Sequence, residues 1–196
     1  QQYFEDIIHK DVVDRYRIRN AKQLIEIARY LVSVSGSKVS LNKLSKVFGI
    51  SKDTLSQYIG YMIDAFLLFE VTYFSYSAKI RHDVTKLPKL YALDNGLINA
   101  ISIKYSGNIG RIFENTVLIK LLEKFEEVHY WSELKSEVDF IVDKIALNIT
   151  ATDKIHEREM QGLMDFQKRH KGFSSLIVTQ AKTENNMLSI SNFLSQ

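Results

Sequence analysis

Hydrophobic residues recur every three or four positions along much of the first half of the chain, and this spacing predicts amphipathic helices. The clearest stripe runs through Leu24, Ile27 and Leu31. After residue 68 the pattern changes to β-branched and aromatic residues, which is typical of a strand. We therefore expect helices over residues 3–16, 20–34, 41–48 and 52–68, followed by strands over residues 69–76 and 89–93.

The second half of the chain alternates between helical and strand patterns. A short helix is expected after residue 94, a strong amphipathic helix over residues 111–125, and three strands over residues 128–134, 136–143 and 145–152. A helix over residues 155–171, a strand over residues 174–180 and a final short strand or helix complete the order. The pattern predicts an α/β (α+β) fold of two domains, residues 1–94 and 95–196.

Two short helices that meet at Gly49 predict a helix-turn-helix, which places its second helix in the major groove of DNA. Ser40 and Ser51 are suited to cap the starts of these helices. Together with the strands 69–76 and 89–93, they predict a winged helix. The residues expected to contact DNA are Lys43, Lys46, Lys52, Ser56 and Gln57 on the helices and Lys79 and Arg81 in the wing, with Gly60 and His82 beside them.

The charge around these helices is consistent with contact to phosphate groups. Four lysines and one carboxylate, Asp53, stand between Gly36 and Gly60. Such an excess is the usual footprint of nucleic-acid binding. Exposed lysines also solvate helical faces that bind nothing, and winged helices also act as protein-interaction modules, so both alternatives stay open.

Composition narrows the possible classes of protein. The 196 residues carry a formal net charge of +3 and no cysteine, which excludes disulfides and thiolate metal sites and favours a cytoplasmic location. No apolar run is long enough to cross a bilayer, so no membrane contact is expected. The chain starts in a charged helical pattern without a methionine, which predicts a fragment of a longer protein.

Residues 114–150 carry part of the pattern of metal-dependent nucleases. These enzymes place a glutamate on a helix, an aspartate on a strand and Glu-x-Lys on the next strand, where the carboxylates hold Mg²⁺ and the lysine neutralises phosphate charge. Glu114 and Asp139 occupy the first two positions, but Asn148 and Thr150 stand at the third. Because that pair supplies neither a carboxylate nor a cation, we expect structural roles for Glu114 and Asp139 and no tight Mg²⁺ binding or turnover.

Two other groups of residues have simpler interpretations. His156 and Glu159 lie in one short run, but without a second histidine they predict the solvated start of a helix and not a zinc site. Tyr130 and Trp131 could stack on bases. On a strand that faces a core they are expected to be packing residues.

Five stretches in a fixed order resemble one known family. They are YFEDIIHKDVVDRYRIRN, GISKDTLSQYIGYMIDAFLLFEV, KLYALDNGL, GRIFENTVLIKLL and YWSELKSEVDFIV. The chain resembles the carboxy-terminal region of archaeal and bacterial AAA-type ATPases, in which an ATPase core precedes a winged helix and a restriction-endonuclease-like (PD-(D/E)xK-type) domain of unknown function. The resemblance implies that the nuclease signature maps onto Glu114 and Asp139 and is lost at Asn148 and Thr150.

The resemblance also implies a missing ATPase domain as the partner of this chain. No G-x-x-x-x-G-K-[ST] loop occurs in the 196 residues, so ATP and its Mg²⁺ are expected to be cofactors of the parent protein alone. The expected function is binding of duplex DNA by the winged helix beside a non-catalytic nuclease-like domain. Two alternatives stay open. One is an active Mg²⁺-dependent nuclease that uses Glu114, Asp139 and a further carboxylate such as Glu137 or Asp153. The other is a protein-interaction or oligomerisation module that binds through Phe69, Tyr73, Phe74 and Tyr76.

Overall fold

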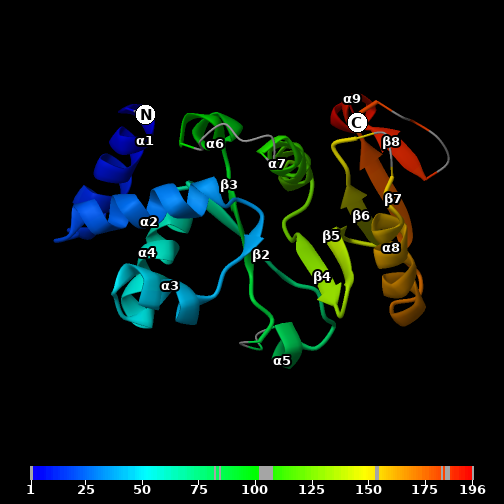
Figure 1. The fold of residues 1–196 in the computed structure, drawn as a ribbon, viewed down its shortest axis with the longest axis horizontal. Coiled ribbons are helices and arrows are strands. Elements are labelled where there is room, and N and C mark those ends of the chain that lie inside the picture. Colours follow the sequence, from blue (N-terminus) through cyan, green and yellow to red (C-terminus); the bar gives the residue numbers. More distant parts are fainter. Residues whose placement is uncertain are drawn as a thin grey trace. The chain divides into compact units, whose positions relative to one another are not determined.

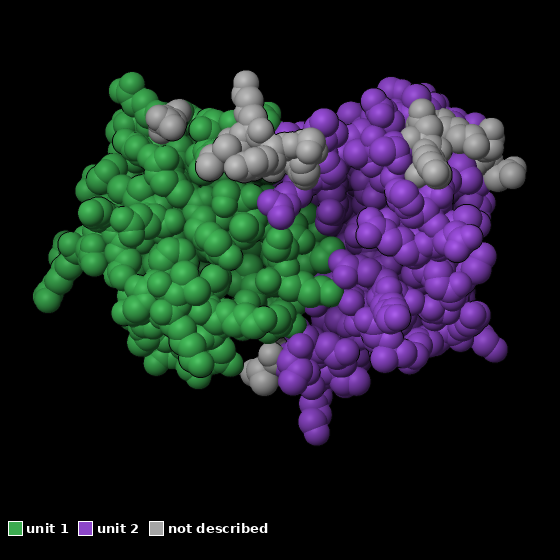
Figure 2. Space-filling model, in the orientation of Figure 1, with its two compact units in different colours: residues 1–70, 87–108 green, residues 71–86, 109–196 purple. Residues whose placement is uncertain are grey.

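The computed structural model describes residues 2–81, 83, 85–101, 108–152, 155–181, 183 and 186–195. Its helices and strands form a mixed α+β fold that divides into two compact units (Figure 1). Unit 1 comprises residues 1–70 and 87–108, and unit 2 comprises residues 71–86 and 109–196 (Figure 2). The chain thus leaves unit 1 within strand β2 (Leu68–Tyr73), returns to it before strand β3 (Lys89–Ala92), and leaves it again after residue 108.

Unit 1 begins with a helical segment whose middle is wound more widely than an α-helix. Helix α1 (Gln2–Ile7) continues into a π-helix, η1 (Ile8–Asp14). Phe4, Ile8 and Val12, spaced four residues apart, are fully buried. Residues at this spacing drift around an α-helix with 3.6 residues per turn, and the wider turn keeps them on one side. The segment expected to be an α-helix over residues 3–16 is therefore helical but only partly α.

The next elements of unit 1 are α2 (Ala21–Ser33), β1 (Ser37–Lys38), α3 (Leu41–Phe48) and α4 (Lys52–Asp64). The side chains of Ser40 and Ser51 each accept a hydrogen bond from the backbone N–H three residues further on, and so cap α3 and α4. Gly49 ends α3 with a φ of 65°, a conformation that glycine adopts without steric cost. The expected helices, caps and turn are confirmed.

The strands of unit 1 follow the order β1, β3, and then the first half of β2. β1 and β3 are antiparallel, with Ser37 opposite Leu90. Helix α6 (Asn95–Ile101) follows β3. The core of the unit consists of apolar side chains from its helices and from β3, among them Leu24, Leu31, Leu55, Met62 and Tyr91.

Unit 2 is built on a sheet with the strand order β2, β4 (His129–Glu133), β5 (Ser136–Val142), β6 (Ile145–Ile149), β7 (Ser174–Thr179) and β8 (Met187–Ser189). The consecutive strands β4, β5 and β6 are antiparallel, whereas the pairs β2–β4, β6–β7 and β7–β8 are parallel. A parallel pair needs a crossover connection, and α8 (Glu157–Arg169) supplies it between β6 and β7.

The remaining helices of the described chain are α5 (Ala78–Arg81), α7 (Asn108–Leu122) and α9 (Ile190–Leu194). The final strand or helix expected from the sequence is a strand, β8, followed by a helix, α9. α8 packs on β5 and β6. Tyr130 and Trp131 are fully buried, as expected for packing residues. Among the residues that the structure describes, no helix combines the length and apolarity needed to span a membrane.

Candidate functional site

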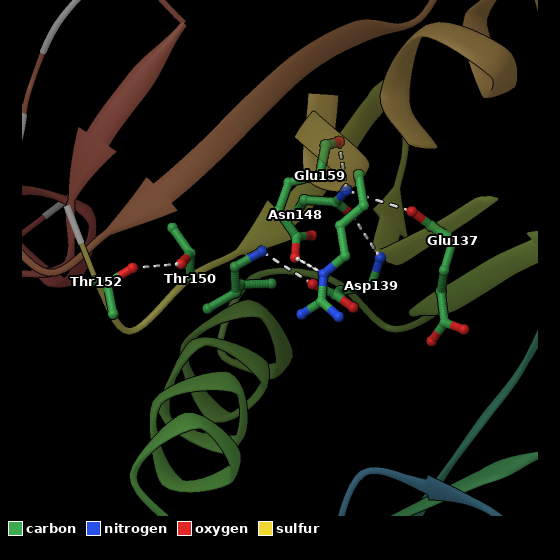
Figure 3. A network of polar contacts seen from close by, with 8 residues as sticks. Glu137, Asp139, Asn148, Thr150, Thr152 and Glu159 are labelled. Atoms are coloured by element: carbon green, nitrogen blue, oxygen red, sulfur yellow. Dashed lines mark hydrogen bonds and ion pairs between the residues drawn. The ribbon is translucent and has the colours of Figure 1, made fainter. Parts of the chain in front are cut away.

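The antiparallel ladder between β5 and β6 ends where Asp139 and Asn148 would be the next opposed pair. The last residues in register are Phe140 and Leu147. Beyond them, the backbone N–H of Asp139 donates to Oδ1 of Asn148 and the backbone N–H of Ile149 donates to Oδ2 of Asp139, both at 2.9 Å (Figure 3). Side-chain oxygens therefore take over the role of backbone acceptors at the point where the two strands separate.

A bulge in β5 lies at the same place. Between two paired positions, β4 contributes only Tyr130 whereas β5 contributes both Asp139 and Phe140. A bulge of this kind bends its strand and re-aims a side chain. The bend coincides with the separation of β5 from β6 and turns the Asp139 carboxylate toward the backbone of β6.

The side-chain amide of Asn148 joins three elements. Its Nδ2 donates to the carbonyl oxygen of Glu137 on β5 at 3.3 Å and to that of Glu159 on α8 at 2.8 Å. Helix α8 lies very close to the sheet here, because a Cβ atom placed on Gly162 would lie 2.1 Å from the same Glu137 oxygen and 3.3 Å from Nδ2 of Asn148. The lack of a side chain at Gly162 therefore leaves the room that α8 needs to pack against the Asn148 amide.

Thr150 follows β6 and continues the same line of hydrogen bonds. Its backbone N–H donates to the carbonyl oxygen of Val178 at 2.9 Å, and its Oγ1 lies 3.3 Å from Oγ1 of Thr152. Asn148 is 0% exposed and Thr150 is 8% exposed. Asn148 and Thr150 are therefore both buried in unit 2, where Asn148 joins the sheet to α8 and Thr150 bonds to β7.

This arrangement does not fit the Mg²⁺ site of a nuclease. Oδ2 of Asp139 and Oδ1 of Asn148 already accept backbone hydrogen bonds, and the amide brings no negative charge for a cation that prefers carboxylate ligands. The hydroxyl of Thr150 cannot supply the positive charge that stabilises a phosphate in the transition state. Among the described residues, Asn148 and Thr150 therefore supply neither a carboxylate nor a cation at this place.

Two of the other carboxylates that the sequence indicated lie in the described part of unit 2. Glu114 lies half-buried on α7, and Glu137 lies half-buried on β5. Within the described parts of the chain, no group of three His, Cys, Asp or Glu side chains could hold a metal ion. Asp153 lies outside the described residues.

The short run with His156 and Glu159 lies at the start of α8. His156 is the N-cap residue of α8, but its side chain makes no capping hydrogen bond. Glu159 forms an ion pair with Arg158, in which Nε donates to Oε1 at 3.0 Å. The start of the helix expected from this run is confirmed.

Unit 1 presents the five expected DNA contacts of the two helices on its surface. All of their side chains are exposed, whereas Leu44, Leu55 and Ile59 between them are buried. Among the described residues, no atom beyond the local backbone of α4 lies within 4 Å of the place where a Cβ of Gly60 would be, so this turn of α4 is open. The structure thus brings together on α3 and α4 the residues Lys43, Lys46, Lys52, Ser56 and Gln57.

The two expected wing contacts belong to unit 2. Lys79 and Arg81 lie on α5, within residues 71–86. Lys79 is exposed, whereas Arg81 is half-buried and its Nε is buried without a hydrogen-bond partner. His82 lies outside the described residues.

Sequence reasoning missed an aromatic and basic cluster in unit 2. Phe74 makes edge-to-face contacts with Tyr76 and His170, with both pairs of ring centroids 5.3 Å apart. His170 ends α8, and the residues around it read Lys-Arg-His-Lys. That basic run was the available signal, but its nearness to residues 71–86 arises only in the folded chain.

The buried border of this cluster is polar. Tyr73 donates to Oε1 of Glu133 at 3.2 Å, and Arg169 pairs with Oε2 of the same carboxylate at 2.6 Å. Burial, and then the nearby Glu133 charge, raise the pKa of Tyr73. Burial also lowers the pKa of His170, with the Arg169 charge acting in the same direction and Glu133 opposing it. His170 is therefore held in its neutral form more strongly than an exposed histidine.

These features define a chain of two units, one with an exposed helix pair and one with a closed, hydrogen-bonded centre. Residues 1–107 match the model of the family described as Domain of unknown function (DUF8612), and the chain belongs to this family. Residues 109–194 match a second model, Domain of unknown function (DUF4143). The first match includes residues 71–86, which the structure assigns to unit 2.

Two curated relatives share part of the chain. An uncharacterized protein of Methanocaldococcus jannaschii is 31% identical over 151 residues, which are 72% of this chain and 33% of that protein. An uncharacterized protein of Haemophilus influenzae is 26% identical over 146 residues, which are 72% of this chain and 36% of that protein. The chain thus spans about a third of the length of the curated relatives it matches. No solved structure gives a significant match.

Proposed function

We propose that the chain binds duplex DNA through α3 and α4, which form the helix-turn-helix of a winged helix. The observation that carries the proposal is the joint exposure of Lys43, Lys46 and Lys52 on two helices that meet at Gly49. The order α2, β1, α3, α4, β2, β3, in which the short helix α5 stands between β2 and β3, and the strand order β1, β3, β2 support this proposal. α4 enters the major groove, and Ser56 and Gln57 face the base edges.

The open surface at Gly60 supports this placement of α4. No side chain of the described residues fills the space above it. A helix without a side chain at that position can approach a sugar-phosphate backbone closely. The lysines contact phosphates, which gives affinity and salt dependence, while the serine and glutamine carry the sequence preference.

In this proposal unit 2 is a restriction-endonuclease-like domain that retains the fold but not the catalytic residues. The hydrogen bonds of Asn148 and the burial of Thr150 support this part of the proposal. Both residues occupy the place of the Glu-x-Lys pair, and both have structural roles there. The parent protein is an AAA-type ATPase of the cytoplasm, and its ATPase domain is the partner of this chain. ATP turnover there, with its own Mg²⁺, gates the engagement of DNA.

Fluorescence anisotropy of the 196-residue chain with a labelled duplex of about 25 base pairs, titrated at several salt concentrations, tests the duplex proposal. Each lysine that contacts a phosphate contributes about 0.9 to the slope of log affinity against log salt. The triple variant Lys43→Glu, Lys46→Glu, Lys52→Glu is expected to lower affinity at least tenfold and to lower this slope by roughly 2–3.

The matched control changes three exposed lysines outside α3 and α4, namely Lys10→Glu, Lys22→Glu and Lys135→Glu. It carries the same change in net charge and is expected to keep most of the affinity. If the two triple variants lose affinity equally, the binding is a general charge effect and α3 and α4 are not the interface.

A second candidate function is protein interaction, and one observation favours it. Phe66, just after α4, is 80% exposed and has a φ of 54°, a conformation that is costly for an aromatic residue. Val47 on α3 is 71% exposed. Under this alternative the chain self-associates or binds a protein through α3 and α4, and light scattering would show Phe66→Ser to reduce the mass of the assembly.

A further inference from the structure

Two basic segments that are far apart in the sequence meet at one aromatic cluster in unit 2. Tyr76 lies in the segment after β2, and His170 lies at the end of α8. Their ring centroids are 5.9 Å apart at an interplanar angle of 54°. Phe74 contacts both rings. The buried ring of Phe166 packs against His170, with ring centroids 4.6 Å apart and an interplanar angle of 31°. The fold thus fixes the two rings side by side.

The rings of this cluster differ in their access to solvent. Phe166 is fully buried and Phe74 and His170 are half-buried, whereas Tyr76 is 68% exposed. Exposure of a large aromatic side chain on a fixed support leaves a flat surface available for stacking. Because burial keeps His170 neutral, its ring adds to that surface without carrying a charge of its own at neutral pH.

The two segments that carry the Tyr76 and His170 rings are rich in basic residues. Residues 75–86 and 167–172 contain six lysines and arginines and a single carboxylate, Asp83. Arg169 pairs with Glu133, and Lys168 pairs with Asp165 at 3.2 Å while its side chain stays 71% exposed. Lys79 and Lys171 are exposed. The cluster therefore combines stacking surfaces with positive charge, which are the two components of a single-strand binding site.

We propose that this surface of unit 2 binds single-stranded nucleic acid. A base stacks on Tyr76 and His170, and neighbouring phosphates contact Lys79, Lys168 and Lys171. In a duplex the bases already stack on one another, so that exposed rings favour a single strand. The surface shares no residue with α3 and α4. The proposal of single-strand binding therefore does not depend on the proposal of duplex binding.

The test is anisotropy of the 196-residue chain with a fluorescein-labelled oligothymidine of 20 nucleotides at low salt. Tyr76→Ala is expected to weaken binding about tenfold, and Tyr76→Phe, which keeps a stacking ring, to preserve it. Lys168→Glu with Lys171→Glu is expected to weaken binding and reduce its salt dependence. A 20-nucleotide abasic strand, which offers phosphates without bases, is expected to bind about tenfold more weakly than oligothymidine. An oligouridine arm distinguishes RNA from DNA.

The matched control is Phe66→Ala, which removes another exposed aromatic ring, from unit 1, and is expected to leave oligothymidine binding unchanged. The triple lysine variant of α3 and α4 is likewise expected to bind oligothymidine normally even if it loses the duplex. Thermal unfolding of each variant checks that it is folded. Equal binding by Tyr76→Ala and the wild-type chain, equal binding of the abasic strand, or no binding of oligothymidine at low salt would each overturn the proposal.

Discussion

The side-chain amide of Asn148 donates a 2.8 Å hydrogen bond to the carbonyl oxygen of Glu159 and so ties β6 to the first turn of α8. The same nitrogen donates to Glu137, and the amide oxygen accepts from Asp139. A carboxylate at this position has no N–H to give. Asn148 is therefore suited to this position because its side chain both donates and accepts hydrogen bonds.

Restoring the nuclease pattern should damage the fold and not create an enzyme. Asn148→Glu with Thr150→Lys places two charged groups in a buried region and leaves the carbonyl oxygens of Glu137 and Glu159 without their donor. We expect a loss of at least ~2 kcal/mol in the free energy of unfolding and no plasmid nicking in Mg²⁺. Urea titration and a nicking assay measure both.

The control for this double change makes the same substitutions at exposed positions, Asn42→Glu and Thr85→Lys. It is expected to stay within about 0.5 kcal/mol of the wild-type chain. Nicking that appears in the restored variant and disappears with Asp139→Ala would show that the proposed loss of chemistry is wrong.

Two glycines that both lie inside helices should respond in opposite directions to alanine. A Cβ at residue 162 would meet the Glu137 carbonyl at 2.1 Å, so Gly162→Ala must push α8 away from the sheet, at a cost of about 1–3 kcal/mol. Gly60 has open space, and Gly60→Ala is expected to stabilise α4 by about 0.5–1 kcal/mol. Equal urea midpoints for the two variants would contradict the close approach at Gly162.

The same pair of variants bears on DNA binding. If α4 lies in the groove with Gly60 against the backbone, Gly60→Ala lowers duplex affinity while raising stability. A variant that gains in both would place Gly60 away from the DNA.

Much of the fold follows from the sequence pattern, because it rests on local physics. α2, α3 and α7 appear within three residues of their expected bounds, and α4 starts where expected but ends four residues early, since each has an apolar stripe. The caps at Ser40 and Ser51 follow from side-chain chemistry that operates within one turn. The burial of Trp131 follows from its place on a strand that faces the core.

The parts that escape sequence reasoning depend on contacts between distant segments. The parallel pairing of β2 with β4 joins Thr72 to His129, and no local pattern encodes it. The substitution of side-chain oxygens for backbone acceptors at Asp139 and Asn148 requires the bulge in β5 and the closeness of α8. The meeting of Tyr76 with His170 likewise joins segments that are far apart in the sequence.

Acid should weaken the fold through Asp165. Hydrogen bonds from Gln161, Ser136 and Lys168 lower the pKa of this carboxyl to about 2. Because its pKa is lower in the folded chain than the value of about 3.9 in the unfolded chain, the stabilisation is complete above about pH 4 and is lost as the pH falls toward 2.

Asp165→Asn is expected to flatten the dependence of the unfolding free energy on pH between about 4 and 2, relative to the wild-type chain. Glu157→Gln, a matched change at an exposed position of the same helix, is the control. Parallel stability curves for the wild-type chain and Asp165→Asn across this range would show that the three hydrogen bonds do not persist in solution.

Residues 71–86 pack with unit 2 although they lie between two segments of unit 1, so neither unit is continuous in the sequence. A cut at residue 108, where the two family matches meet, would leave Phe74 and Tyr76 on a fragment without His170, Phe166 and Phe173, their ring partners. Neither unit is a continuous module that recombination could move by a single crossover. The two halves are expected to be inherited as a pair. A first half truncated at residue 108 is expected to expose the side chains of Phe74 and Tyr76, which would lack their ring partners.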